Sequence, residues 1–343
     1  MGRRHRRSTR HENGRDAIRI AGRSYPILDR IRIRGQTYLI LQRLAPPPRE
    51  RFLVCDPAAG NRLRLLLLLP NDDSTAQHLN VLRNLQSRQL PEIVNHDRRE
   101  DQTRIVLSWT QGIDLGQYFE RIEQNKVQPP TPFHAFRLLR GIGHGLTSLH
   151  KHARIIHGDL KPANLVISRK PSHLSLIDFG SAWPIEETTV RKPGDGVSPN
   201  YAAPEQQIAG ARVDERADQF AASVILYQLL TLKVPYEGLG GRAGTPEHFD
   251  KDNLAVPPSA CPRHTRFLPR ALWRQIDEVV LQGLAFDPGQ RFATSTQWLD
   301  ALESVFLQLQ LRESNIEQTS GLWQRLCNWF AGTPENSAPS EFS

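Results

Sequence analysis

Residues 157–164 read HGDLKPAN, residues 177–180 read IDFG and residues 203–205 read APE, and these three segments decide the fold. Asp159 in the first segment lies nineteen positions before Asp178 in the second, and the third segment ends twenty-seven positions further on. One such triplet alone carries little information. Three in this order and spacing, among short predicted strands, leave chance a negligible explanation.

The order H-R-D-L-x-x-x-N, D-F-G and A-P-E is typical of protein kinases, and the chain resembles that family over roughly residues 36–310. The resemblance is to the bacterial serine/threonine type. It implies an α+β fold of two lobes within residues 24–310: a small, β-rich N-lobe at about 24–109 and a larger, helical C-lobe at about 112–310. The short apolar alternations before residue 109 and the helical spacing after residue 112 agree with this division.

The resemblance also implies roles for single residues. Phosphoryl transfer depends on positioning and charge stabilisation more than on covalent chemistry. Asp159 is expected to orient the substrate hydroxyl and accept its proton, and Lys161 to neutralise the transferring phosphoryl group. Asn164 and Asp178 are expected to hold Mg²⁺, a hard cation that prefers oxygen ligands. The implied cofactors are therefore ATP and Mg²⁺, and the implied substrate is a protein.

Other residues are expected to bind the nucleotide, to position the acceptor or to support the site. Leu107 and Trp109 are implied to contact the nucleotide, and residues 198–201, SPNY, resemble the loop that positions an acceptor Ser or Thr. Asp218 is expected to brace the catalytic loop. A buried ion pair between Glu205 and Arg291 is expected to be structural.

The N-terminal half departs from the family pattern. Where the family has a glycine-rich loop over the phosphates, residues 45–52 read APPPRERF, with three prolines and no glycine. Proline has no backbone N–H to offer a phosphate. The position of the family's strand lysine is assigned to Leu66, and no lysine precedes Lys126. Arg62 and Arg64 share a strand face with Leu66 under period-two alternation, so either is a candidate substitute cation, and the alternative is that both are surface arginines.

Two further positions differ from an active kinase. The helix that should carry the glutamate partner of the strand lysine has His78 at the matching position, so the Lys–Glu ion pair is absent on both sides. Gly158 replaces the arginine of the H-R-D motif, which normally receives the activation-loop phosphate. We therefore expect loop 181–200 not to be ordered in that way.

Two functions from different classes follow. The first is an ATP- and Mg²⁺-dependent serine/threonine protein kinase with an atypical nucleotide-binding N-lobe. The alternative is a catalytically weak or dead pseudokinase that acts as a binding or scaffold regulator of a protein partner. Losing one preorganised electrostatic donor costs roughly 10²–10³ in rate, which does not decide between them.

The N-terminal tail is strongly basic. The net charge of the chain is +8, and residues 1–23 hold eight arginines against two acidic residues. This segment is predicted to be disordered. It is either a solvated leader or an arm for an acidic partner, an anionic lipid or nucleic acid. Binding to nucleic acid would be steeply salt-dependent.

The C-terminal segment, the apolar runs and the cysteines give three further expectations. Residues 311–331 are predicted to form an amphipathic helix that docks on the protein's own surface, a partner or a membrane surface, and residues 332–343 a polar tail. The longest apolar run, Leu65–Leu69, is far too short to span a bilayer. Three widely spaced cysteines make neither a disulfide framework nor a zinc site, which favours the cytoplasm.

Overall fold

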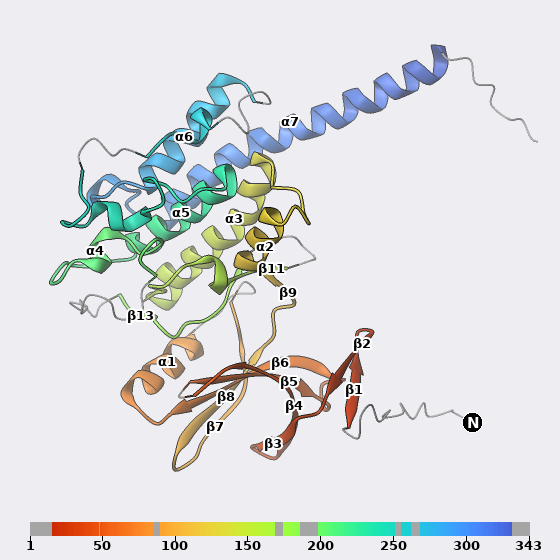
Figure 1. The fold of residues 1–343 in the computed structure, drawn as a ribbon, viewed down its shortest axis with the longest axis vertical. Coiled ribbons are helices and arrows are strands. Elements are labelled where there is room, and N and C mark those ends of the chain that lie inside the picture. The colour runs from red at the N-terminus through yellow and green to blue at the C-terminus, as the bar shows by residue number, and fades with distance from the viewer. Residues whose placement is uncertain are drawn as a thin grey trace, which may run out of the picture.

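The computed structural model describes residues 16–47, 49–84, 90–168, 174–185, 198–250, 255–261 and 268–330. In these ranges the chain forms a small lobe built on a β-sheet and a larger, mainly helical lobe (Figure 1). The predicted two-lobed α+β fold is confirmed.

The small lobe is organised around a six-stranded antiparallel sheet in the order β3-β4-β5-β6-β8-β7. Its strands are β3 Asp29–Ile33, β4 Gln36–Ala45, β5 Glu50–Asp56, β6 Arg62–Pro70, β7 Ile93–Arg98 and β8 Gln102–Ser108. One helix, α1 (Asp73–Asn84), packs Val81 and Leu82 against one face of the sheet. The turn between β5 and β6 closes at Gly60, whose φ of +71° is readily adopted by glycine.

A hairpin corrects the prediction that residues 1–23 are disordered. Strand β1 (Ala17–Ile20) pairs with β2 (Arg23–Pro26), and the turn uses Gly22 at a φ of +85°. The backbone N–H of Ile27 also donates to the carbonyl of Asp16 at 2.7 Å. Short β-branched runs can form strands even beside charged residues, because cross-strand pairing satisfies the backbone. Residues 1–15, which hold most of the basic tail, lie outside the described part.

The large lobe contains the longer helices and several short strands. Its helices are α2 Leu115–Glu123, α3 Pro132–Thr147, α4 Pro204–Gln207, α5 Arg216–Thr231, α6 Arg270–Gly283 and α7 Ser295–Phe330, with a wider helical turn at Ser148–Ala153 and 3₁₀ turns at Pro162–Asn164, Gly240–Gly244, Pro258–Ala260 and Pro288–Gln290. Its strands are β9 Gly112–Asp114, β10 Ile155–Ile156, β11 Leu165–Ser168, β12 Leu174–Leu176 and β13 Trp183–Pro184. Strands β12, β11 and β9 form one small sheet, and β10 pairs with β13.

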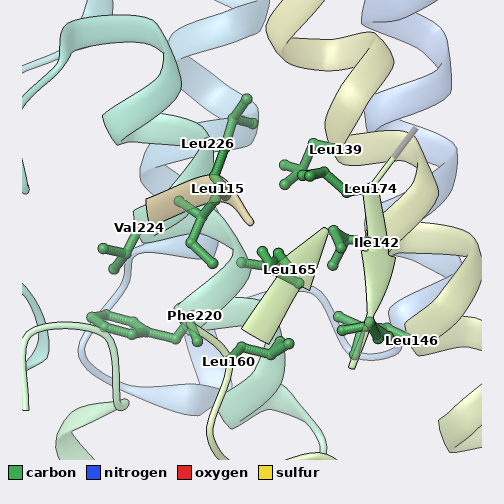
Figure 2. Close-up of a cluster of buried hydrophobic side chains, with 14 of the residues drawn as sticks. Leu115, Leu139, Ile142, Leu146, Leu160, Leu165, Leu174, Phe220, Val224 and Leu226 are labelled. Atoms are coloured by element: carbon green, nitrogen blue, oxygen red, sulfur yellow. The ribbon is translucent and has the colours of Figure 1, made fainter. Parts of the chain in front are cut away.

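The core of the large lobe fixes the segment 157–164. Figure 2 shows Leu160 of that segment beside Leu165 of β11, in a cluster with Leu146 of α3 and Phe220 of α5. All four side chains are almost completely buried. Burial of a leucine side chain contributes roughly 1.5–3 kcal/mol, so Leu160 anchors the loop between its polar neighbours.

Helix α7 is longer than predicted. It runs without a break over 36 residues, so the predicted helix at 311–331 is the continuation of one that begins at Ser295. Its first half packs on α3, where Arg140 donates to Glu303 at 2.7 Å and Phe133 stacks on Phe306. Its second half extends away from the lobe (Figure 1). Residues 332–343 lie outside the described part, and no helix within it is long and apolar enough to cross a bilayer.

Candidate active site

The segment 157–164, the candidate catalytic loop, holds Asp159 at the centre of a small polar group. The Lys161 Nζ donates to Oδ2 of Asp159 at 2.7 Å. The Ser198 hydroxyl donates to Oδ1 at 3.0 Å. The Asp159 side chain is 10% exposed, so it is largely buried and yet reachable. The structure therefore brings together the predicted base, the predicted phosphoryl-neutralising lysine and a hydroxyl from the predicted acceptor-positioning loop.

Asn164 connects this group to Asp178. Its side-chain N–H donates to the backbone carbonyl of Asp159 at 2.8 Å, which leaves the amide oxygen as the atom that can face a cation. Its own backbone carbonyl accepts from the N–H of Ile177 at 2.9 Å. Because β11 and β12 pair in antiparallel register, this bond places Asp178 immediately beside the catalytic loop.

Asp218 braces the catalytic loop, as predicted. It lies near the start of α5, and its carboxylate accepts from the backbone N–H groups of His157 and Gly158 at 2.8 and 2.9 Å, while His150 Nε2 lies 2.8 Å away. Burial alone raises the pKa of Asp218. The His150 contact and the backbone donors outweigh burial and hold the pKa below its usual value.

Gly158 stands where a side chain has no room. Its φ is +76°, and a Cβ built on it would lie 1.9 Å from Cζ3 of Trp183. The indole ring of Trp183 on β13 thus fills the space next to the catalytic loop. This explains locally why the motif carries glycine in place of arginine. Residues 186–197, within the loop predicted to lack phosphate ordering, lie outside the described part.

The predicted ion pair between Glu205 and Arg291 is present. Arg291 donates from Nη1 and Nη2 to the two carboxylate oxygens at 2.6 and 2.8 Å, in a bidentate arrangement. The Arg291 side chain is fully buried and its partner nearly so. The pair fixes the APE segment to the α6–α7 connection and touches none of the catalytic residues.

The faces of β6 correct the assignment of the lysine position. Leu66 is fully buried on the face that it shares with Tyr38, Val54 and Val106, away from α1. Leu67 lies on the opposite face with the residues that pack under α1. The strand position whose side chain faces the catalytic loop is therefore Leu67, one residue later than predicted, because neighbouring strand residues point to opposite faces.

The same alternation removes Arg64 as a nucleotide-binding cation. Arg64 pairs across the sheet with Val54 and thus lies on the Leu66 face. Its Nε is 3.6 Å from Oδ2 of buried Asp56. Arg62, two residues earlier on that face, is exposed. The expectation that either arginine reaches the phosphates was wrong, because both side chains leave the sheet on the other side.

A different arginine, Arg51, lies beside Asp178. Arg51 on β5 donates from Nη2 to Oδ2 of Asp178 at 2.8 Å. The backbone N–H of Gly180 donates to Oδ1 at 3.2 Å, and Asp178 itself adopts a φ of +64°. Burial raises the pKa of Asp178, but the charge and hydrogen bond of Arg51 outweigh it and lower the pKa.

His78 on α1 is buried against this pair. Burial, together with the charges of Arg49 and Arg51, lowers the pKa of His78 to about 4, although Asp178 acts in the opposite direction. His78 is therefore neutral at neutral pH. It offers no negative charge to a cation, which agrees with the predicted loss of the Lys–Glu pair.

Leu107 and Trp109 lie at the end of β8 and just beyond it. Leu107 is buried and pairs across the sheet with Leu65, on the α1 face of the sheet. Trp109 is partly exposed in the segment that leads to β9. Their position between the lobes is compatible with contact to a nucleotide base, which stays a prediction.

A family model described as "Protein kinase domain" matches residues 69–302, more than half of the chain. The chain belongs to the protein kinase family. The match begins at the end of β6, so the departures in the first strands of this kinase domain fall outside the matched segment.

Curated relatives are serine/threonine kinases of bacteria. The kinase domain is 33% identical over 196 residues to serine/threonine-protein kinase PknB of Mycolicibacterium smegmatis, covering 56% of this chain and 29% of that protein. It is 26% identical over 203 residues to serine/threonine-protein kinase PrkC of Bacillus subtilis, covering 59% and 29%. It is 31% identical over 183 residues to serine/threonine-protein kinase pkn2 of Myxococcus xanthus, covering 52% and 21%. The chain thus spans less than a third of the length of these relatives. The similarity supports the bacterial serine/threonine type.

The donor set of this kinase domain fits a magnesium ion shared with a phosphate. Asn164 and Asp178 offer amide and carboxylate oxygens from adjoining strand ends. Mg²⁺ in phosphoryl-transfer sites uses one or two protein carboxylates and completes its shell with phosphate and water. No cluster of three or more His, Cys, Asp or Glu side chains in the described residues could hold a metal ion without such help.

Sequence reasoning missed Arg51, because it looked for a substitute cation only on the strand that lost the lysine. The register supplies the missing signal: Arg51 lies directly opposite Leu67. Cross-strand partners share a face and lie about 4.5–5.5 Å apart at Cβ. A search of the neighbouring strand, counted back from the Asp56–Gly60 turn, leads to this arginine.

Proposed function

We propose that the chain is a serine/threonine protein kinase that uses ATP and Mg²⁺ despite its altered N-lobe. The observation that carries the proposal is the Asp159 carboxylate, which accepts a hydrogen bond from the Ser198 hydroxyl while Lys161 contacts its other oxygen. A carboxylate in hydrogen-bond contact with a hydroxyl has the geometry that a general base needs.

The proposed reaction moves one phosphoryl group. The hydroxyl oxygen of a protein Ser or Thr attacks the γ-phosphorus of ATP, the bond from that phosphorus to the bridging oxygen breaks, and ADP leaves. Asp159 orients the hydroxyl and accepts its proton. Lys161 places a positive charge next to the transferring group, where charge stabilisation contributes most.

Asn164 and Asp178 are the residues that would hold magnesium. When bound, the ion neutralises negative charge on the phosphates. Leu107 and Trp109 are proposed to contact the base of the nucleotide. Asp218 accepts hydrogen bonds from the backbone N–H groups of His157 and Gly158 and so supports the loop that carries Asp159.

The test is transfer of labelled γ-phosphate from ATP, with Mg²⁺ or Mn²⁺, to the protein itself and to a generic protein acceptor. Asp159→Asn is compared with Asp300→Asn, which changes an exposed carboxylate on α7. We expect transfer by the wild type and Asp300→Asn and loss of at least about 10²-fold in Asp159→Asn. Equal transfer in all three, or none in the wild type, would contradict the proposal.

A second candidate function is a pseudokinase that binds and regulates a protein partner. It is favoured by Leu67 at the position that faces the catalytic loop, by neutral His78 and by prolines in the loop between β4 and β5. The outcome expected for it is nucleotide-independent binding of a partner, with no transfer that depends on Asp159.

Location and other partners are further proposals. We propose a cytoplasmic kinase domain acting on proteins, in line with its widely spaced cysteines. An acidic partner or nucleic acid for the arginine-rich tail stays a prediction. Salt-dependent binding that disappears when residues 1–15 are deleted would support it.

A further inference from the structure

Arg51 projects from the sheet at the point where the lysine is missing. It lies in β5 directly opposite Leu67 of β6, and Leu67 in turn lies opposite Ile105 of β8. Cross-strand partners point to the same face. The Arg51 side chain therefore leaves the sheet beside Leu67, on the side that faces the catalytic loop.

The contact made by Arg51 places its positive charge beside Asp178. Its guanidinium reaches Oδ2 of Asp178 at 2.8 Å, and the side chain is 38% exposed. A guanidinium has five N–H donors in a fixed fork, and the bond to Asp178 uses only part of this capacity. The guanidinium therefore has the donors to engage the oxygens of another anion placed next to the proposed magnesium ligand.

Helix α1 offers the Arg51 guanidinium no carboxylate at the position of the family's helix glutamate. The family's lysine is paired with a helix glutamate, whereas α1 presents buried His78 here. The loop between β4 and β5 contains Pro46 and Pro47, which have no N–H to donate to a phosphate. Side-chain donors must then supply what backbone amides and a lysine supply elsewhere in the family.

We propose that Arg51 is the residue that binds the phosphates of the nucleotide, in place of the strand lysine, which rests on the proposed function because the ligand is ATP. On binding, the guanidinium exchanges its bond with Asp178 for phosphate oxygens, and Asp178 becomes available to the metal. Arginine suits this role because its planar fork matches phosphate bidentately.

Two other cations, Arg64 and Lys161, contact carboxylates other than Asp178. Arg64 contacts Asp56 on the opposite face of the sheet, and Lys161 contacts Asp159. Arg64 thus points away from the site, and Lys161 is held at the proposed base.

The experiment measures binding, so it does not require transfer. The affinities for ATP, ADP and adenosine are determined by titration calorimetry, with Mg²⁺ and with EDTA, for the wild type, Arg51→Ala and Arg51→Lys. Arg62→Ala is the matched control, since it removes an exposed arginine from the same sheet on the opposite face. The double variants Arg51→Ala/Leu67→Lys and Arg51→Ala/Leu66→Lys move a cation to either face of β6.

We expect Arg51→Ala to weaken ATP and ADP binding about 10- to 100-fold under both metal conditions, the effect of losing a charged hydrogen bond. Adenosine binding should be unchanged, which also shows that the variant is folded. Arg51→Lys should retain most of the affinity. Leu67→Lys should restore ATP binding to Arg51→Ala, and Leu66→Lys should not.

Several results would overturn the proposal: ATP binding unchanged in Arg51→Ala, an equal loss for adenosine, tighter binding without the arginine, or a wild type that binds no ATP. The two proposals fail separately. If ATP binding depends on Arg51 but phosphoryl transfer does not depend on Asp159, only the proposed kinase activity is wrong. If transfer depends on Asp159 but ATP binding is the same with and without Arg51, only the proposed role of this arginine is wrong.

Discussion

The indole ring of Trp183 occupies the space into which a side chain at position 158 would project, with Cζ3 at 1.9 Å from a Cβ built on Gly158. Trp183 lies on β13, which pairs with β10 immediately before the catalytic loop. A tryptophan thus supports the loop from the side where the H-R-D motif of other kinases carries arginine. Restoring that arginine would require the ring to move.

Gly158→Ala should destabilise the protein by about 2–5 kcal/mol, through left-handed backbone strain and overpacking against Trp183. Gly210→Ala is the control, because Gly210 also has a positive φ, +77°, but nothing lies within 4 Å of the added Cβ. It should cost only about 1–2 kcal/mol from backbone strain. Urea denaturation measures both, and equal losses would show that Trp183 does not restrict position 158.

Asp218 should make the free energy of unfolding depend on pH in the acidic range. Its folded-state pKa is depressed, so its contribution is present above the unfolded value of about 3.9 and is lost as pH falls through the lower folded pKa. Asp218→Asn removes this titration. The difference in free energy of unfolding between wild type and Asp218→Asn should therefore be largest near neutral pH and shrink below about pH 4. A difference independent of pH would contradict the lowered pKa.

The pair between Glu205 and Arg291 should behave as one unit. Glu205→Ala leaves a fully buried guanidinium without its carboxylate, and we expect a loss of about 3–5 kcal/mol. The double variant Glu205→Ala/Arg291→Met should cost less than the sum of Glu205→Ala and Arg291→Met. Denaturant titration of the four proteins gives the coupling. Additive losses would indicate that backbone contacts of Arg291 matter more than the pair.

Lys161→Ala should lower kcat for phosphoryl transfer by about 10²–10³, with a smaller change in KM, because its charge is most useful when the phosphoryl group is in transit. Lys151→Ala, an exposed lysine ten residues earlier, is the control and should transfer at the wild-type rate. An unchanged kcat in Lys161→Ala would remove the lysine from the proposed mechanism.

Much of the large lobe could be predicted, because its signals are local in sequence. The motif around Asp159 is contiguous, and the helical spacing after residue 112 is borne out by α3, α5 and α6. The bracing role of Asp218 followed from the resemblance to the family. These features depend on short-range patterns that tertiary contacts reinforce.

The strand faces of the small lobe were harder to predict, for a physical reason. Five consecutive leucines, Leu65–Leu69, show no alternation, so the sequence does not indicate which ones face the catalytic loop. A shift of one residue exchanges Leu66 for Leu67 and moves the search for a cation to the wrong face. Strand β7 (Ile93–Arg98) shows no strand pattern in its largely polar sequence, IVNHDR, and pairing with β8 stabilises it instead.

The bond between Arg51 and Asp178 joins the two lobes, because the arginine belongs to the sheet and the aspartate to the segment after β12. This ion pair is called the tether. Partly exposed ion pairs contribute on the order of 0–1 kcal/mol, so this tether is weak enough to be released by a modest competitor. Any anion that draws the guanidinium away from Asp178 therefore also removes this contact between the lobes, so the charge of the ligand and the contact between the lobes are linked through one side chain.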